Sequence, residues 1–142
     1  MIILDTNVIS EVMKPTSNHA VRSWMNRQNN ETLYLTSVTQ AEIFYGIAVL
    51  PPGRRKDGLT DTFNGLLKHF AGRILPFDSE AAYHYAQMAA TARAAGRAFP
   101  VQDGYIAAIA ASRNFTVATR DATPFEAGGV QVINPWEESP AV

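Results

Sequence analysis

The sequence predicts a three-layer α/β/α domain with a central, mostly parallel sheet of four to five strands. Three observations predict it: short apolar runs recur along the chain, segments with helical spacing lie between them, and helix-start or helix-stop signals mark most junctions. Strands that alternate with helices favour parallel pairing, with helices on both faces of the sheet. We expect residues 1–134 to form one domain and residues 135–142 a C-terminal tail.

The first third of the chain contains two expected strands and two expected helices. Residues 1–4 are apolar without alternation, which indicates a short strand buried on both faces. The next segment turns into a helix that ends near Met13, because Pro15 cannot continue it. A second helix spans residues 18–28, and residues 33–35 form the second strand.

The middle of the chain is expected to form two helices. Ser37 and Gln40 have the spacing of a capping box, in which two side chains satisfy exposed amides at a helix start. That helix runs to about Val49, and residues 54–72 form the next one. The second helix carries an apolar stripe that consists of Leu59, Phe63, Leu66, Leu67 and Phe70. The stripe is either core or part of a groove that receives an amphipathic helix of a partner.

The remaining elements carry clear end signals. Three strands are expected over residues 74–77, 117–119 and 130–133, and two long helices over residues 80–95 and 102–113. Asp78 precedes the first of these helices as its cap, and Gly96 ends it. Thr123 and Glu126 resemble a second capping box with Pro124 at the first helical position, which predicts one helical turn there.

The composition excludes several classes of chemistry. Cysteine is absent, so disulfides, zinc–thiolate sites and thiol nucleophiles are excluded together. The three histidines are far apart in the sequence, which argues against zinc. No long apolar run is present, and we expect a soluble, cytoplasmic protein without a membrane segment. The net charge of −1 leaves a nucleic-acid substrate possible, because local clusters such as Arg54-Arg55-Lys56 can supply positive charge.

Four acidic residues lie where an expected strand meets a helix, or just inside a helix. They are Asp5, Glu42, Asp103 and Asp121. Because ligands bind at the carboxyl ends of parallel strands, these side chains are expected to share one cleft. Two carboxylates ~4 Å apart repel by roughly 4 kcal/mol at an effective dielectric of about 20, so a cation is needed. Carboxylate oxygens suit Mg²⁺ or Mn²⁺, and the four acids therefore predict a metal site.

Each acid also has an ordinary structural interpretation. Asp5 and Asp121 are favoured as helix caps, and Asp103 is stabilised near a helix start by the helix dipole. Glu42 is harder to explain in this way because its helix is mostly apolar, although a solvent-facing Glu remains an alternative. The four together, in this order, favour a functional site.

The motifs resemble those of a known family. LDTNVISE at 4–11, TQAEIFYGI around Glu42, QDGYIAAIA at 102–110 and TRD at 119–121 are similar to segments of PIN-domain ribonucleases. The resemblance is closest to toxin subunits of VapBC-type toxin–antitoxin pairs, in the FitB-like branch, and it covers the chain from Met1 to about Asn134. Many relatives have Ala where this chain has Gln102, and many have Asn where it has Asp121.

The resemblance implies a PIN-like fold and a Mg²⁺- or Mn²⁺-dependent endoribonuclease. The family's acidic metal-site positions match Asp5, Glu42, Asp103 and Asp121, which are therefore the expected catalytic residues and metal ligands. Whether Glu42 binds metal directly or orients a water stays open. Thr6 and Thr119 are expected to support the site by bonding a carboxylate, a water or a phosphate. Arg120 is a further supporting residue, which contacts a phosphate or pairs with a carboxylate.

The resemblance also implies partners. A small cognate antitoxin is expected, with a basic side chain placed in the acidic cleft. A homodimer and a toxin–antitoxin hetero-oligomer are expected as well. Any DNA contact would come through the antitoxin, because the sequence contains no DNA-binding motif of its own.

Two other functions remain as alternatives. In the first, the chain is a non-catalytic or weakly catalytic subunit whose acidic pocket docks the antitoxin in a DNA-binding autoregulatory complex. In the second, Asp5 after a strand belongs to a phosphotransferase of the haloacid-dehalogenase type. Asn7 weakens this alternative because that chemistry needs a second Asp at its position.

Overall fold

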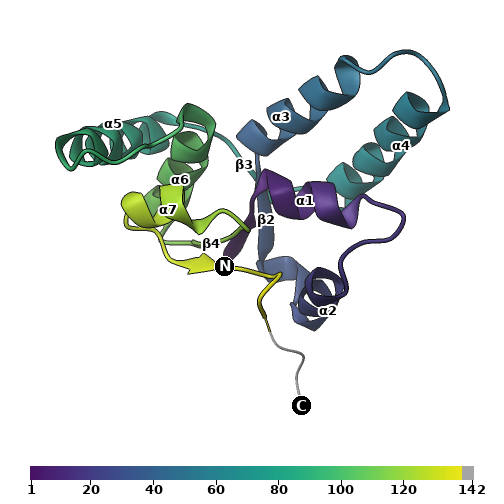
Figure 1. The fold of residues 1–142 in the computed structure, drawn as a ribbon, viewed down its shortest axis with the longest axis horizontal. Helices are drawn as coiled ribbons and strands as arrows, with labels where there is room; N and C mark the ends of the chain where they lie inside the picture. The colour runs from purple at the N-terminus through teal and green to yellow at the C-terminus, as the bar shows by residue number, and fades with distance from the viewer. Residues whose placement is uncertain (139–142) are drawn as a thin grey trace.

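A parallel sheet of five strands forms the centre of the molecule (Figure 1). The computed structural model describes residues 1–138. The strands are β1 (Ile2–Leu4), β2 (Leu33–Thr36), β3 (Ile74–Leu75), β4 (Thr116–Ala118) and β5 (Val132–Ile133). Their order is β3-β2-β1-β4-β5, and every neighbouring pair is parallel. The predicted fold class is confirmed, and the sheet is parallel throughout.

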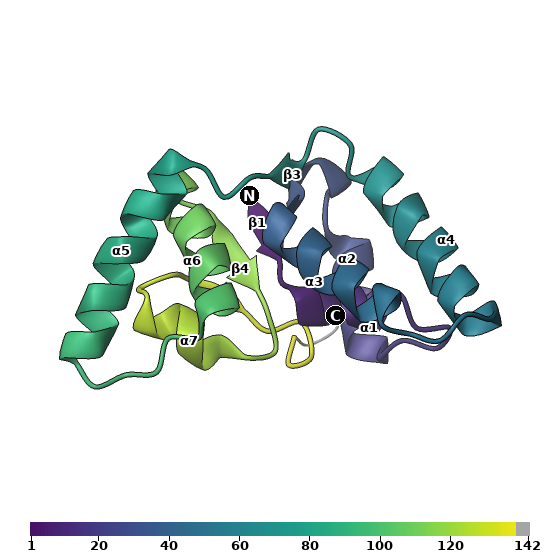
Figure 2. The same ribbon diagram turned by 90° about the horizontal axis from the view of Figure 1, so that it is seen from above.

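Helices cover both faces of the sheet (Figure 2). One face carries α1 (Thr6–Val12), α2 (His19–Arg27), α3 (Ser37–Ala48) and α4 (Arg54–His69). The other carries α5 (Ser79–Ala94), α6 (Val101–Arg113) and α7 (Ala122–Ala127). A short 3-10 turn, η1 (Asn30–Thr32), precedes β2. Within residues 1–138, no helix combines the length and apolar character needed to cross a bilayer.

Strand β1 has a hydrophobic core on each side. Ile3 and Leu4 are both fully buried, but Leu4 belongs to the core under α1–α4 and Ile3 to the core under α5–α7. In the neighbouring strand, Ala118 belongs to the core under α1–α4 and Val117 to the core under α5–α7. Successive side chains of a strand point to opposite faces, so a sheet covered on both sides requires continuous apolar runs. The central position of β1, covered on both faces, explains why apolar and polar residues do not alternate over residues 1–4.

The edge strands are shorter than the sequence suggested. The expected strand over residues 74–77 ends at Leu75, because Pro76 has no N–H group to donate to the sheet. The expected strand over residues 130–133 contains only Val132 and Ile133. The N–H of Val130 instead donates to the carbonyl of Phe125 and closes the end of α7.

Both predicted capping boxes are wrong. Strand β2 continues one residue further than expected, so Thr36 caps α3 and accepts a hydrogen bond from the Thr39 N–H at 3.1 Å, whereas Ser37 is already helical. Helix α7 begins at Ala122, which places Thr123 inside the helix. Pro124 is then the third helical residue, where its missing N–H costs nothing because first-turn amides have no intrahelical partner.

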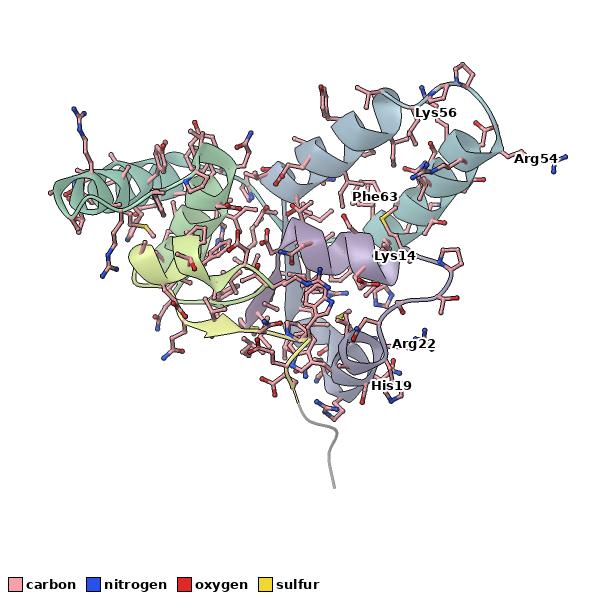
Figure 3. The ribbon with its side chains drawn as sticks, in the orientation of Figure 1. Lys14, His19, Arg22, Arg54, Lys56 and Phe63 are labelled. Atoms are coloured by element: carbon pink, nitrogen blue, oxygen red, sulfur yellow. The ribbon has the colours of Figure 1, made fainter. Side chains whose placement is uncertain are left out.

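The apolar stripe of α4 packs against the core. Phe63 and Phe70 are buried, and Phe63 lies between α3 and α4, edge-on to Phe44 (Figure 3). The other members of the stripe, Leu59, Leu66 and Leu67, are partly buried against the same cluster. The helix ends at His69 rather than near residue 72, because Gly72 turns the chain with a φ of 80°.

Helices α5 and α6 approach each other closely at Gly104. A Cβ atom at this position would lie 2.9 Å from the ring of Tyr85 and 3.0 Å from that of Phe99. Contacts this short do not occur at ordinary Cβ atoms, so only glycine fits without moving the two rings. Because Asp103 is the adjacent residue, this packing also fixes the position of one of the four acids.

The segment after β5 folds back onto the body of the protein. The N–H of Trp136 donates to the Asn134 side chain at 3.0 Å, and the indole packs against the core under α1–α4. Trp24 is buried in the same core, so both tryptophans of the chain serve as packing residues. Of the expected tail, residues 139–142 lie outside the described part of the chain.

The cap of α3 can be tested by two matched substitutions. Thr36→Val keeps the shape of a fully buried side chain but removes the oxygen that accepts from the Thr39 N–H. We expect it to lower the free energy of unfolding by about 1 kcal/mol, measured by urea denaturation. Ser37→Ala should change it by much less. A larger loss of unfolding free energy for Ser37→Ala than for Thr36→Val would show that Ser37, as the capping box predicts, is the cap of α3.

Candidate active site at the carboxyl ends of the strands

Asp5 lies at the topological switch point of the sheet. It follows β1, and the next strand in sequence, β2, lies on one side of β1 while β4 lies on the other. One carboxylate oxygen of Asp5 accepts from the Thr6 N–H at 2.7 Å, and the other accepts from the Thr119 hydroxyl at 2.8 Å. Asp5 is therefore both the cap of α1 and a buried acid at the head of a cleft, with 4% of its surface exposed.

Glu42 faces the same region from α3. Its Oε1 accepts a hydrogen bond from the Thr6 hydroxyl at 2.9 Å, and the Thr39 hydroxyl lies 3.0 Å from that of Thr6. Since the Thr6 hydroxyl has a single hydrogen, it donates to Glu42 and accepts from Thr39. Glu42 is half-buried and its carboxylate is held by Thr6 of α1, so it is not a freely solvent-facing residue.

Asp103 and Asp121 approach the cleft from the other half of the molecule. Asp103 is in the first turn of α6 and half-buried, and Asp121 immediately precedes α7 and is exposed. Neither carboxylate makes a hydrogen bond that caps its helix. Capping therefore does not account for these two acids.

Burial and neighbouring charges raise the pKa of two of the acids, Asp5 and Asp103. Burial raises the pKa of Asp5 from its ordinary 3.8 to about 6; the charges of Asp103 and Glu42 add to this, while the bonds from Thr119 and Thr6 oppose it. Burial also raises the pKa of Asp103, with contributions from the charges of Asp121 and Glu42. Asp5 is thus within reach of the charges of Asp103 and Glu42, and Asp103 within reach of those of Asp121 and Glu42.

No cation of the described chain neutralises this environment. Among residues 1–138, the ion pairs are Lys14 with Glu11 and Arg113 with Asp78, and neither involves one of the four acids. The same residues contain no group of three acidic, histidine or cysteine side chains already gathered into a metal cluster. The donors nevertheless fit Mg²⁺ or Mn²⁺: all are carboxylates, and Mg²⁺ keeps several waters and needs only one or two of them directly.

A cavity of about 440 Å³ opens beside the acids. Its lining includes Asp5, Thr6 and Asp103 together with residues that the motifs did not select as site residues: Asn7, Ser10, Glu11, Lys14 and Trp136. Arg120 also lines it, and its guanidinium carbon lies 4.2 Å from the centre of the Trp136 ring. Arg120 thus does not form the carboxylate pair considered from the sequence; it stacks on an indole.

Asn7 connects the two strand ends. Its side-chain amide donates to the Thr119 hydroxyl at 3.1 Å, and its carbonyl oxygen accepts from the Arg120 N–H at 3.3 Å. The Thr119 oxygen also accepts from the Asp121 N–H at 3.0 Å. From the sequence, Asn7 served only as an argument against a phosphotransferase and was not predicted to belong to the site. Its position two residues after the first acid is the signal that would have found it.

Glu11 and Lys14 close the cavity at the end of α1. The buried Glu11 accepts from the Asn18 N–H at 3.1 Å and from Lys14 at 3.2 Å. Burial alone would raise the pKa of Glu11, but these bonds and the charges of Lys14 and Arg120 outweigh it and hold the pKa below its ordinary value. The pair fixes the connection from α1 to α2.

A second, larger groove leads away from the acids between α1, α3 and α4. Its volume is about 720 Å³, and Thr6 and Glu42 line it together with Ser10, Thr62 and mainly apolar residues. The apolar part consists of Met13, Pro15, Ile43, Gly46, Ile47, Leu50, Gly58 and Leu59. Lys14, Arg54 and Arg55 also line it, and Figure 3 shows Lys14 at the end of α1 and Arg54 at the start of α4.

The fold and the site define a class of protein. A family model described as PIN domain matches residues 2–129, and the chain belongs to the PIN-domain family. The resemblance found in the sequence motifs is thereby confirmed.

The chain is similar to toxins within that family. It is 48% identical over 138 residues to the VapC ribonuclease Y4jK of Sinorhizobium fredii, which covers 96% of this chain and 99% of the relative. Toxin FitB of Neisseria gonorrhoeae is 45% identical over 139 residues, covering 97% of this chain and 100% of the relative.

Solved structures give the same result. The crystal structure of FitAcB from Neisseria gonorrhoeae matches with a TM-score of 0.92 and 45% identity, covering 97% of this chain and all of that one. The structure of FitAB bound to the IR36 DNA fragment has a TM-score of 0.92 and 44% identity, with 98% of each chain covered. A VapBC structure from Salmonella typhimurium, at 24% identity and a TM-score of 0.81 over 94% of this chain and 97% of that one, shares the fold.

The pKa of Asp5 predicts a pH dependence of stability. Because the folded value of about 6 exceeds the ordinary 3.8, this group stabilises the fold fully below about pH 4 and loses that contribution as the pH rises through about 6. Between these limits the loss is about 3 kcal/mol in metal-free protein. Asp5→Asn should remove this pH-dependent loss. The free energy of unfolding of the variant should therefore rise relative to that of the wild type from about pH 4 to pH 7.

The measurement is urea denaturation at several pH values in the presence of a chelator. Asp61→Asn removes an exposed acid of α4 and should follow the wild-type pH dependence. Parallel curves for wild type and Asp5→Asn over the whole range would contradict the assigned shift.

Proposed function

We propose that this protein is a Mg²⁺- or Mn²⁺-dependent endoribonuclease that acts as the toxin of a type II toxin–antitoxin system in the cytoplasm. The observation that carries the proposal is the pair of acids Asp5 and Asp103 at one cavity, under the influence of the charges of Glu42 and Asp121 and with no ion-pair partner among residues 1–138. The similarity to a protein named VapC ribonuclease supports the reaction type.

The proposed role of each residue follows from its position in the site. Asp5 and Asp103 are the proposed direct ligands, since each is fixed at the start of a helix beside the cavity. Asp121 is proposed to complete a second metal-binding position. Glu42, oriented by Thr6, is proposed to bind metal or to accept a proton from the attacking water. A divalent cation bound by these acids would lower the pKa of water and neutralise phosphate charge.

Thr119 and Thr6 act on the acids rather than on the substrate in this proposal. The Thr119 hydroxyl holds one oxygen of Asp5 at 2.8 Å and the Thr6 N–H holds the other at 2.7 Å, so the orientation of the carboxylate is fixed. Thr6 holds Glu42 in the same way at 2.9 Å. Hydrolysis then forms one P–O bond to the water oxygen and breaks another in the RNA backbone.

Removal of one acid tests the nuclease function. Asp5→Asn or Asp103→Asn should lower metal-dependent cleavage of RNA by at least about a hundredfold, because each removes a charged ligand. Cleavage is measured on labelled total RNA with Mg²⁺ or Mn²⁺ and with excess chelator. Glu80→Gln, which changes an exposed acid at the start of α5, is the matched control and should cleave as wild type does.

Two results would contradict this function. Cleavage that persists in excess chelator would exclude a metal-dependent site. Purified wild-type protein that binds an antitoxin tightly but cleaves no RNA at any metal concentration would favour the non-catalytic docking subunit instead.

A cognate antitoxin is the proposed partner, and the groove between α1, α3 and α4 is its proposed docking site. The groove is mainly apolar, which suits the apolar face of a helix, and it ends at Glu42, where a basic side chain of the partner would meet the acids. The matched structures include FitAB bound to DNA, which supports a toxin–antitoxin complex that binds DNA through the antitoxin. A homodimer of this chain is part of the same proposal.

Two glycines of α4 offer a matched test of the docking site. Gly58 lines the groove and Gly65 does not, and a Cβ atom at either would meet nothing within 4 Å. Gly58→Gln should weaken the complex with the antitoxin by about tenfold or more because its side chain fills the groove. Gly65→Gln should leave the complex unchanged, although both replacements favour the helix by up to about 1 kcal/mol.

The complex is measured by titration of the purified protein with its cognate antitoxin. Thermal unfolding of both variants checks that neither has lost stability. Equal affinities of the Gly58→Gln and Gly65→Gln proteins for the antitoxin would place the docking site elsewhere.

A further inference from the structure

Arg120 and Trp136 form a stacked pair at the edge of the cavity beside the acids. The guanidinium carbon of Arg120 lies 4.2 Å from the centre of the Trp136 ring, and both residues line the cavity that contains Asp5 and Asp103. A guanidinium over an indole face gains a cation–π interaction, which is strongest for tryptophan. The pair joins the TRD segment to the residues after β5, which are distant in sequence.

Both partners of the pair are fixed by their backbones. The Arg120 N–H donates to the Asn7 side chain at 3.3 Å. The Trp136 N–H donates to the Asn134 side chain at 3.0 Å, and the Thr119 N–H donates to the carbonyl of Ile133 at 2.9 Å. The strand ends that carry the two residues are thus hydrogen-bonded to each other.

Arg120 is held next to the acids without pairing with any of them. No carboxylate of residues 1–138 forms an ion pair with its guanidinium, whereas Lys14 in the same cavity pairs with Glu11 at 3.2 Å. A long basic side chain beside uncompensated carboxylates would normally close onto them. Stacking on the indole restrains Arg120 from doing so and leaves the N–H edge of its planar group available to an oxyanion ligand.

We propose that Arg120, oriented by Trp136, binds an RNA phosphate adjacent to the one that is cleaved. This inference rests on the proposed ribonuclease function and adds a substrate-binding position to it. Arg120 contacts the substrate, and Trp136 is a positioning residue that acts through Arg120. RNA is favoured over an acidic protein partner because Arg120 lies in the cavity of the acids rather than among the residues that line the apolar groove.

The first test measures binding without cleavage. The probe is a fluorescein-labelled, single-stranded RNA of mixed sequence, followed by anisotropy in excess EDTA at several salt concentrations. Arg120→Gln should weaken binding about tenfold and reduce the slope of log K against log salt by about 0.7, the value for one phosphate contact on a single strand. Arg120→Lys should keep the slope but lose affinity, because the ammonium lacks the planar fork.

Variants of Trp136 separate positioning from packing. Trp136→Leu should weaken RNA binding several-fold while Trp136→Phe, which keeps an aromatic face, should recover most of it. With Mg²⁺ present, Trp136→Leu should raise KM and leave kcat nearly unchanged. Arg93→Gln removes an exposed charge from α5 and is the control for a simple loss of positive charge.

Intrinsic fluorescence gives an independent readout. The chain has two tryptophans, so Trp24→Phe leaves Trp136 as the sole indole. Addition of the RNA probe to this protein should change the Trp136 emission, and Arg120→Gln in the same background should remove that change.

The outcomes distinguish this inference from the ribonuclease function. RNA affinity and salt slope that are unchanged in Arg120→Gln and Trp136→Leu, in a protein that still cleaves RNA, would overturn the inference and leave the function intact. Loss of antitoxin affinity with unchanged RNA affinity would also overturn it and assign the pair to a protein partner. Arg120-dependent RNA binding in a protein that cleaves nothing would support the RNA contact and overturn the nuclease.

Discussion

The hydrogen bond from Thr119 to Asp5 is the contact on which the arrangement of the site depends. It joins the carboxyl ends of β1 and β4, which come from opposite ends of the chain, at the point where the order of the sheet reverses. Asn7 reinforces the same junction by donating to Thr119. With these strand ends fixed, Asp5 and Arg120 line one cavity, which Asp103 at the start of α6 reaches from the other half of the chain.

The protein accommodates this convergence at a cost in stability. Burying Asp5 destabilises its charged form, and the neighbouring acids add to the effect. Two hydrogen bonds to Asp5 reduce the cost but do not remove it, and no cation of the described chain offsets it. Binding sites commonly retain such unfavourable electrostatics, because a ligand that relieves them is then bound more tightly in the folded state.

The sequence predicted the fold and the four acids better than their local connections. Non-alternating apolar runs identified buried strands, and the order of the motifs indicated the family. The capping box at Ser37 was misplaced because β2 is one residue longer than its apolar run suggests, and the one at Thr123 because α7 begins one residue earlier, at Ala122. The stack of Arg120 on Trp136 was not predictable, since it depends on β5 pairing with β4 and carries no periodic signal.

The two-residue edge strands have a consequence for how copies of this chain associate. Strands β3 and β5 expose only a short row of backbone donors and acceptors, and Pro76 interrupts the row directly after β3. An edge this short is a poor template for an added strand, whether from a second copy or from an unfolding neighbour. Pairing of copies through their sheet edges is therefore disfavoured, even when the protein is made without a partner to cover it.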